Sequence, residues 1–227
     1  MTALNPTSIF CTDWSVHVTI KTTESTKVRD GRSTREAILE AASRLIHVHG
    51  YNHTSLDDVL RESGVGKGNF YYHFKSKEDL GYAILDQIIG SFLERTLEPC
   101  FSDPEGHALG QIRCFLDRLL EAQRASNCVG GCPLGNLAAE LSDVHEGFRG
   151  RLASVFAAWR ERLTLVLRSA QSRGTVDVSC QPEAVADFLV ASLEGAILLT
   201  KLTKDIAVME QCVAETKRYL SLFEPRV

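Results

Sequence analysis

The spacing of apolar residues predicts helices throughout the chain and shows no strand pattern. Between Thr34 and His49, apolar side chains recur on one helical face, and Gly50 ends this helix because glycine tolerates left-handed backbone geometry. Ser76 can cap a long helix that we expect to run to about Glu98, before Pro99. Further helices are expected at about 109–126, 133–141, 146–173, 182–204 and 206–222. The fold class is therefore predicted to be all-α.

Two short helices around a glycine turn are predicted between residues 54 and 80. Ser55 and Asp58 have the spacing of a capping box, and Ser63-Gly64 stops the first helix. The second helix runs from about Gly66 to Tyr72, with Val65 and Phe70 anchoring it to the first. This arrangement is typical of a helix-turn-helix, whose second helix enters the major groove of DNA.

The second helix has little bulk at its N-terminal turn. Gly66 and Gly68 let the backbone approach a groove, although each costs about 1 kcal/mol in helix propensity relative to alanine, while Lys67 and Asn69 offer polar contacts to base edges. Donors suited to phosphate oxygens follow, namely Tyr71, Tyr72, His73, Lys75 and Lys77. In a purely structural interpretation Tyr71, His73 and Phe74 are core and the lysines are solvated, and for Phe74 we adopt that interpretation.

Several segments together resemble the N-terminal domain of TetR-type transcriptional regulators. The resemblance covers about residues 32–92 and rests on Thr34-Arg35, Ile38-Leu39, Ala41-Ala42, Gly50-Tyr51, Thr54-Ser55 and the run from Gly64 to Leu80. It implies DNA-facing positions at Thr54 and Ser55, at residues 66–69, and at Tyr71, His73 and Lys77. Gly66 stands where many members carry Ser or Thr, so one hydroxyl contact to the DNA is missing and the bases that are read stay open.

Three regions are expected along the 227 residues. Residues 32–92 would form the three-helix DNA-binding domain and residues 93–227 a helical ligand-binding and dimerisation domain. Residues 1–31 show neither helical periodicity nor a signal peptide, so we expect a disordered extension or a basic arm that orders in a minor groove. The formal charge of −4 does not exclude DNA binding, because basic and acidic residues cancel up to Leu80 and the acidic excess lies beyond it.

The C-terminal half is expected to dimerise and to hold a ligand. The helix from Pro182 is apolar nearly all round and needs burial on two sides; by resemblance, the last two long helices pack against their copies. A homodimer also follows from reading two half-sites of a double-stranded operator. Aromatic and aliphatic residues could line a helical pocket or form ordinary core: Phe115, Leu119, Phe156, Trp159, Leu163 and Phe188.

Seven cysteines without a secretory signal indicate reduced cytoplasmic thiols rather than a disulfide framework. Cys128 and Cys132 flank a Gly-Gly loop, and Cys132 precedes Pro133 at a helix start, where thiol pKa values fall. Cys132 is therefore either a reactive thiolate or a small packing residue. Residues 131–140 also resemble a TetR subgroup in which some members respond to electrophiles through a cysteine here. Zinc is disfavoured because no neighbouring ligands complete a set of four, and no cofactor is expected.

The chain is therefore expected to be a cytoplasmic DNA-binding regulator, nucleoid-associated when bound. We expect a repressor that an unknown small molecule, or electrophile modification of Cys132, releases from its operator. A structural DNA-associated protein of the same fold is the second hypothesis. A cysteine-based enzyme would need a base within reach of Cys132, and His145 is the only nearby candidate. It is disfavoured because no ordered triad accompanies these two residues. The absence of an apolar run of about 18 residues disfavours a membrane span.

Overall fold

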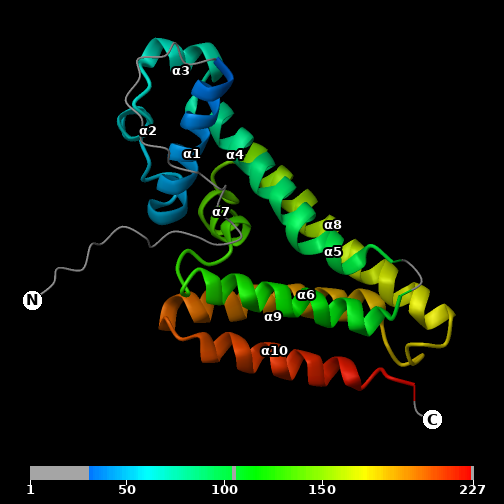
Figure 1. The fold of residues 1–227 in the computed structure, drawn as a ribbon. Helices are drawn as coiled ribbons and strands as arrows, with labels where there is room; N and C mark the ends of the chain where they lie inside the picture. The colour runs from blue at the N-terminus through cyan, green and yellow to red at the C-terminus, as the bar shows by residue number, and fades with distance from the viewer. Residues whose placement is uncertain (1–30, 104–105, 226–227) are drawn as a thin grey trace, which may run out of the picture.

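The computed structural model describes residues 31–103 and 106–225, and the regular secondary structure in these ranges is helical (Figure 1). Four helices begin the fold: α1 (Gly31–His49), α2 (Leu56–Ser63), α3 (Lys67–His73) and α4 (Lys77–Phe92). The first three form a small head at one end of α4 (Figure 1). The basic arm expected over residues 1–31 lies outside the described residues, apart from Gly31, where α1 begins.

The head folds as its local signals predict. Ser55 caps α2 by accepting a hydrogen bond from the Asp58 backbone N–H at 3.1 Å, and the Asp58 carboxylate accepts from the Ser55 N–H at 3.0 Å. Gly64 ends α2 in the left-handed conformation, at φ 65°. The core of the head consists of fully buried apolar side chains from several elements, including Ile38, Phe70, Phe74 and Leu80. Phe74 is therefore core, as expected.

A continuous helical rod leads from the head into the rest of the molecule. After α4 it widens into a π-helical turn, η1 (Leu93–Leu97), and continues as α5 (Glu98–Phe101). The expected stop before Pro99 is wrong, because Pro99 lies inside α5. A proline cannot donate to the carbonyl four residues earlier, which is that of Arg95, and the Arg118 guanidinium donates to this carbonyl instead, at 2.8 Å. The domain boundary expected between residues 92 and 93 thus falls within the rod.

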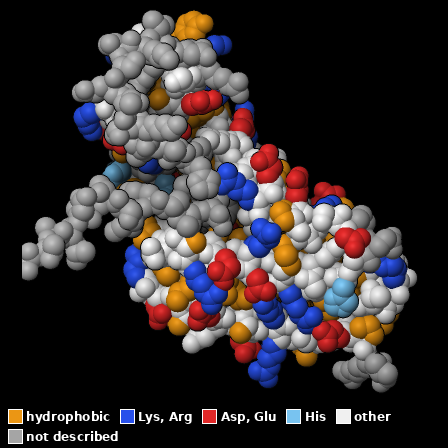
Figure 2. All heavy atoms as spheres, in the orientation of Figure 1, with side chains coloured by type: hydrophobic (Ala, Val, Ile, Leu, Met, Phe, Trp, Pro, Cys, Tyr) orange, Lys and Arg blue, Asp and Glu red, His pale blue; other side chains and the backbone are white. Residues whose placement is uncertain are grey.

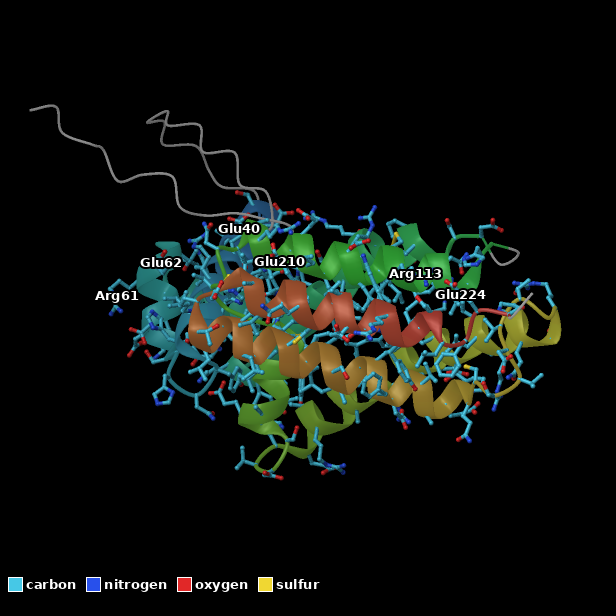
Figure 3. The ribbon with its side chains drawn as sticks, turned by 90° about the horizontal axis from the view of Figure 1, so that it is seen from below. Glu40, Arg61, Glu62, Arg113, Glu210 and Glu224 are labelled. Atoms are coloured by element: carbon cyan, nitrogen blue, oxygen red, sulfur yellow. A yellow bond between two sulfur atoms is a disulfide. The ribbon has the colours of Figure 1, made fainter. Side chains whose placement is uncertain are left out.

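The remaining helices form the body of the molecule: α6 (Ala108–Ala125), α7 (Pro133–Leu141), α8 (Glu146–Ser172), α9 (Pro182–Thr203) and α10 (Ile206–Ser221). α4 and α8 run side by side, and α6, α9 and α10 form a layer below them (Figure 1). Ion pairs join α6 to α10, between Arg124 and Glu210 and between Asp117 and Lys217. Arg113 of α6 and Glu224, just beyond α10, also point toward each other at 2.6 Å (Figure 3). Basic and acidic side chains are interspersed over the visible face of this body (Figure 2), and exposed pairs contribute about 1 kcal/mol or less each.

The core of the body is aromatic where the rod meets α6 and α8. Phe92 lies 5.4 Å from Trp159 and 6.2 Å from Phe115, measured between ring centroids, and Phe101 lies 5.9 Å from Phe115. Next to this cluster, Cys100 of α5 and Cys114 of α6 form a disulfide, with Cα atoms 5.8 Å apart. The expectation that all cysteines are reduced thiols is therefore wrong for this pair, because the packing of α5 on α6 brings them within bonding distance.

No helix within residues 31–103 and 106–225 combines the length and apolarity that crossing a membrane requires.

Candidate nucleic-acid interface and regulatory sites

The N-terminal turn of α3 presents an open, sterically small surface. Residues 66–69 are all exposed, while Phe70 on the opposite face is fully buried and fixes the helix to the head. A Cβ atom added at Gly66 or Gly68 would meet no other atom within 4 Å. The two glycines therefore meet no internal packing requirement, and their absence of side chains leaves room for an external surface such as a DNA groove.

The predicted DNA contacts fall into three groups by exposure. Ser55, Lys67, Asn69, Tyr71, Tyr72 and Lys75 are exposed, with Tyr72 at 82%, whereas His73 is half-buried. Thr54 is 2% exposed, and its hydroxyl donates to the Gly50 carbonyl at 2.8 Å. The expectation that the Thr54 side chain faces DNA is therefore wrong, because this side chain closes the loop between α1 and α2.

Lys77 differs from the other predicted phosphate ligands because the head itself binds its ammonium group. Its Nζ lies 4.3 Å from the centroid of the Tyr51 ring, a cation–π contact. Burial lowers the pKa of Lys77, although the charge of Glu140 opposes this shift. A phosphate contact by Lys77 would compete with the Tyr51 ring, whereas Lys75 is exposed.

Tyr51 connects the head to the body through aromatic contacts. Its ring centroid lies 5.1 Å from that of Phe148 in α8, and Phe148 lies 4.7 Å from Tyr82 in α4. Gly81 of α4 permits this packing, since a Cβ there would approach both Tyr51 and Phe148 to 2.7 Å. Burial, followed by the nearby charge of Glu78, raises the pKa of Tyr51 to about 12, so its hydroxyl stays protonated.

Cys132 lies at the start of α7 and is 8% exposed. Its Sγ accepts a hydrogen bond from the Gly135 N–H at 3.4 Å, and its thiol donates to the Glu194 carboxylate of α9. Burial, followed by the charge of Glu194, raises the pKa of Cys132 well above its ordinary value. Of the two roles considered for Cys132, the buried packing residue fits this environment better than the reactive thiolate, because burial and Glu194 act against the effect of the helix start. Burial also raises the pKa of Cys128.

An apolar cavity of about 200 Å³ lies between the rod and α8. It is lined by Ile89, Phe92, Leu93, Leu97, Ser154, Val155, Ala158 and Trp159. Of the predicted pocket residues, Trp159 lines the cavity. Phe115 and Leu119 are buried core and do not line it, and Phe156 stacks on Trp159 at 5.9 Å without lining it. Leu163 is also buried core, and Phe188 is wrongly predicted, since 46% of it is exposed on α9. The π turn η1, which the sequence did not indicate, contributes Leu93 and Leu97 to the wall.

His145, the one base considered for Cys132 chemistry, is engaged elsewhere. Its Nδ1 caps α8 by accepting from the Phe148 N–H at 3.4 Å, and its Nε2 lies 3.5 Å from Glu78 Oε1. In the part of the chain that the structure describes, no three His, Cys, Asp or Glu side chains converge as a metal ion would require.

Buried Phe70 anchors α3 in a helix-turn-helix, and a long helix joins this head to a larger helical body. This is the architecture of a DNA-binding transcriptional regulator. Residues 38–84 match the family model of bacterial regulatory proteins of the tetR family, and residues 108–215 match that of the tetracyclin repressor-like C-terminal domain. An HTH-type transcriptional regulator of Lactococcus lactis is 34% identical over 179 residues, covering 79% of this chain and 89% of the relative. The chain belongs to the TetR family.

Solved structures agree with this assignment. A TetR regulator from Chloroflexus aurantiacus superposes with a TM-score of 0.77 at 27% identity, covering 87% of this chain and 98% of that one. The reduced form of NemR from Escherichia coli gives 0.73 at 26% identity, covering 82% and 95%. NemR is described as an HTH-type transcriptional repressor, and these relatives are regulators rather than enzymes.

Proposed function

We propose that the chain is a homodimeric repressor that binds an operator through α3 and is released by a small molecule bound between the rod and α8. The exposed turn at residues 66–69 supports the DNA-binding part of this proposal, because its glycines are not required by packing within the protein. Lys67 and Asn69 would contact base edges, while Ser55, Tyr71, Tyr72, His73 and Lys75 would contact phosphates. Lys77 would contribute a phosphate contact only by leaving the Tyr51 ring.

Dimerisation is supported by an exposed apolar stripe on α9. Phe188, Leu198, Leu199 and Leu202 are 46–75% exposed, and at about 100° per residue they fall on one side of the helix. Ala191 and Gly195 lie between them on the same side and allow close approach of a second helix. Such a stripe is typical of an interface. Leu199→Glu should give a monomer by analytical ultracentrifugation that binds a two-half-site operator far more weakly, and an unchanged dimer would contradict this interface.

The cavity is placed to affect DNA binding. Its lining includes Ile89 and Phe92 of α4 and Leu93 and Leu97 of η1, so an occupant would contact the same rod that carries the head. Its residues are uncharged, which favours a small neutral apolar ligand. A coupling of about 1 to 3 kcal/mol between the two sites would change operator occupancy substantially.

Electrophile modification of Cys132 is a second route to release. It is favoured by the position of Cys132 at the start of α7, and a structure of the relative NemR is described as its reduced form. In this structure the buried Cys132 thiol is protonated and so reacts slowly. A modification here would require local opening of the loop before α7.

A gel-shift titration against the DNA upstream of the chain's own gene tests the proposal. We expect a few discrete sites, bound in a salt-dependent manner and weakened by the inducer. The absence of binding even at low salt would overturn the repressor assignment. Many dispersed sites with no ligand effect would instead favour a structural DNA-associated protein. Turnover of an electrophile, rather than stoichiometric labelling, would favour an enzyme.

A further inference from the structure

We infer that Glu140 is a positioning residue for DNA binding, because its carboxylate holds the backbone of the α1–α2 loop and fixes the orientation of the head on the body. Glu140 is the penultimate residue of α7, and Tyr51 and Asn52 follow α1 directly after Gly50. The Tyr51 N–H donates to Glu140 Oε2 at 2.8 Å, and the Asn52 N–H donates to Glu140 Oε1 at 2.6 Å. One carboxylate thus accepts two adjacent backbone hydrogen bonds across the head–body junction.

These two hydrogen bonds are charge-assisted, because their acceptor is a carboxylate. Such bonds are about twice as strong as neutral ones, and two parallel bonds also define direction. Tyr51 is buried, so its N–H would lose a partner that water cannot readily replace. Glu140 therefore restrains the loop in both position and rotation.

The adjacent backbone is shaped to admit the carboxylate. Gly50 has φ +87°, and a Cβ there would approach Glu140 Oε2 to 3.0 Å. A side chain at position 50 would therefore be strained and would also crowd the carboxylate. Lys77, whose ammonium lies over the Tyr51 ring, adds a favourable charge interaction with Glu140.

The opposite end of α7 is fixed to the body. Asn136 Nδ2 donates to the Gly130 carbonyl at 2.6 Å, and Lys201 Nζ of α9 donates to Asn136 Oδ1 at 3.1 Å. Helix α7 is nine residues long, from the loop that contains Cys128 and Cys132 to the contact with the head. It forms a short rigid link beside the rod α4–η1–α5.

Helices α4 and α7 together restrain the orientation of the head on the body more than α4 does by itself. Without the Glu140 hydrogen bonds, α4 and the nondirectional Tyr51–Phe148 ring contact would leave the head more freedom to rotate about the rod, which would change the direction of α3 relative to DNA. The Glu140 contact holds the α1–α2 loop beside the Tyr51–Phe148 ring contact and opposes that rotation. A dimer that reads two half-sites needs both α3 helices in a fixed relation, so loss of this contact should weaken operator binding without removing any DNA ligand.

The experiment compares Glu140→Gln and Glu140→Ala with Glu215→Ala, an exposed glutamate of α10, in the full-length protein. Glutamine keeps the size of the side chain but replaces one of the two acceptors with a donor. In both Glu140 variants, amide hydrogen exchange at Tyr51 and Asn52 should accelerate roughly tenfold or more relative to wild type. Glu215→Ala should leave exchange at these two amides unchanged.

DNA affinity is measured on a duplex that the wild-type protein selects from a random-sequence pool, well below the unfolding temperature. Both Glu140 variants should bind roughly three- to tenfold more weakly with an unchanged slope against log salt, because no phosphate contact is lost. Unchanged or tighter binding, or unchanged exchange at Tyr51 and Asn52, would overturn the inference. If the wild type selects no duplex, the proposed repressor function fails, and the exchange measurement still decides whether Glu140 holds the loop.

Discussion

The ammonium of Lys77 lies over the ring of Tyr51, 4.3 Å from its centroid. Lys77 stands in the run of residues whose family resemblance implies a phosphate contact, yet in the free protein its charge is used within the head. Lys75, two residues earlier, is exposed. Two lysines with similar positions in the sequence therefore have different surroundings, and their contributions to DNA binding can be separated.

Lys75→Ala should reduce the salt dependence of operator binding more than Lys77→Ala does. Each lost phosphate contact lowers the slope of log K against log salt by about 0.9, whereas Lys77 must first leave the Tyr51 ring at a cost of about 0.5 to 1 kcal/mol. Lys77→Ala should instead lower the thermal stability of the head. Gel-shift titrations at several salt concentrations and calorimetric unfolding check both effects. Equal slope changes in the two variants would show that Lys77 is free to contact DNA.

Gly68→Ala should stabilise the free protein and weaken its complex with DNA. Gly68 is the second residue of α3 and has open space around it, and alanine is favoured over glycine in a helix by up to about 1 kcal/mol. The added methyl group lies on the surface that we propose faces the groove. Thermal unfolding and operator affinity are to be measured on the same preparation. Increased stability with unchanged affinity would remove this turn from the interface.

Gly64→Ala is the matched control for that substitution. Gly64 also has open space around it but lies at φ +65°, where an L residue other than glycine costs about 1 kcal/mol or more. This variant should therefore lose stability, while the comparison with Gly68→Ala isolates the effect of a methyl group on DNA binding.

Glu194→Gln should stabilise the protein at neutral pH and make Cys132 more reactive. Burial raises the pKa of Glu194, so its contribution to stability is present below the ordinary carboxyl pKa and is lost as the pH rises through the raised value. Removing the charge should increase the melting temperature at pH 7 and leave it little changed near pH 4. The Cys132 thiol, whose pKa the Glu194 charge raises, should then react faster with N-ethylmaleimide at pH 8.

Peptide mapping of labelled protein measures Cys132 specifically, and Glu215→Gln on the exposed face of α10 serves as the control. An unchanged labelling rate in Glu194→Gln would show that burial alone limits the thiol.

The paired variant Cys100→Ser/Cys114→Ser should lower the free energy of unfolding only under non-reducing conditions. The bonded cysteines are 14 residues apart, and a loop of this size gives a stabilisation of about 3 kcal/mol in the chain-entropy model. Urea unfolding of wild type and variant, each with and without dithiothreitol, measures the effect. A difference that persists in reductant would have to come from packing at the buried Cys100 rather than from the bond.

The elements that were predicted correctly depend on interactions between near neighbours. The cap of α2 joins Ser55 to Asp58, and Gly64 acts through its own backbone, so both were visible in the sequence. The start of α7 at Pro133 is local in the same way. Phe70, expected as the anchor of the second helix, and Phe74, expected as core, are both buried within the head.

The features that were missed depend on partners distant in the sequence. Pro99 continues the rod because Arg118 of α6 supplies the missing donor, and Cys100 meets Cys114 only once α5 packs on α6. Thr54 is the exception: its hydroxyl bonds the Gly50 carbonyl only four residues away, yet it was placed on the DNA side. Glu140 stood at the end of the segment 131–140 that was singled out for its resemblance, but its partners are 88 and 89 residues away.

The π turn at Leu93–Leu97 gives the rod two different faces. A π turn adds one residue to the helix, and at about 100° per residue this rotates the apolar stripe by more than a quarter turn between α4 and α5. The first half of the rod can therefore direct its apolar side to α1 and α7, while the second half directs Cys100 and Phe101 to α6. A return to regular α-helical register would break one of these two packings, so the π turn is what lets one continuous helix serve both.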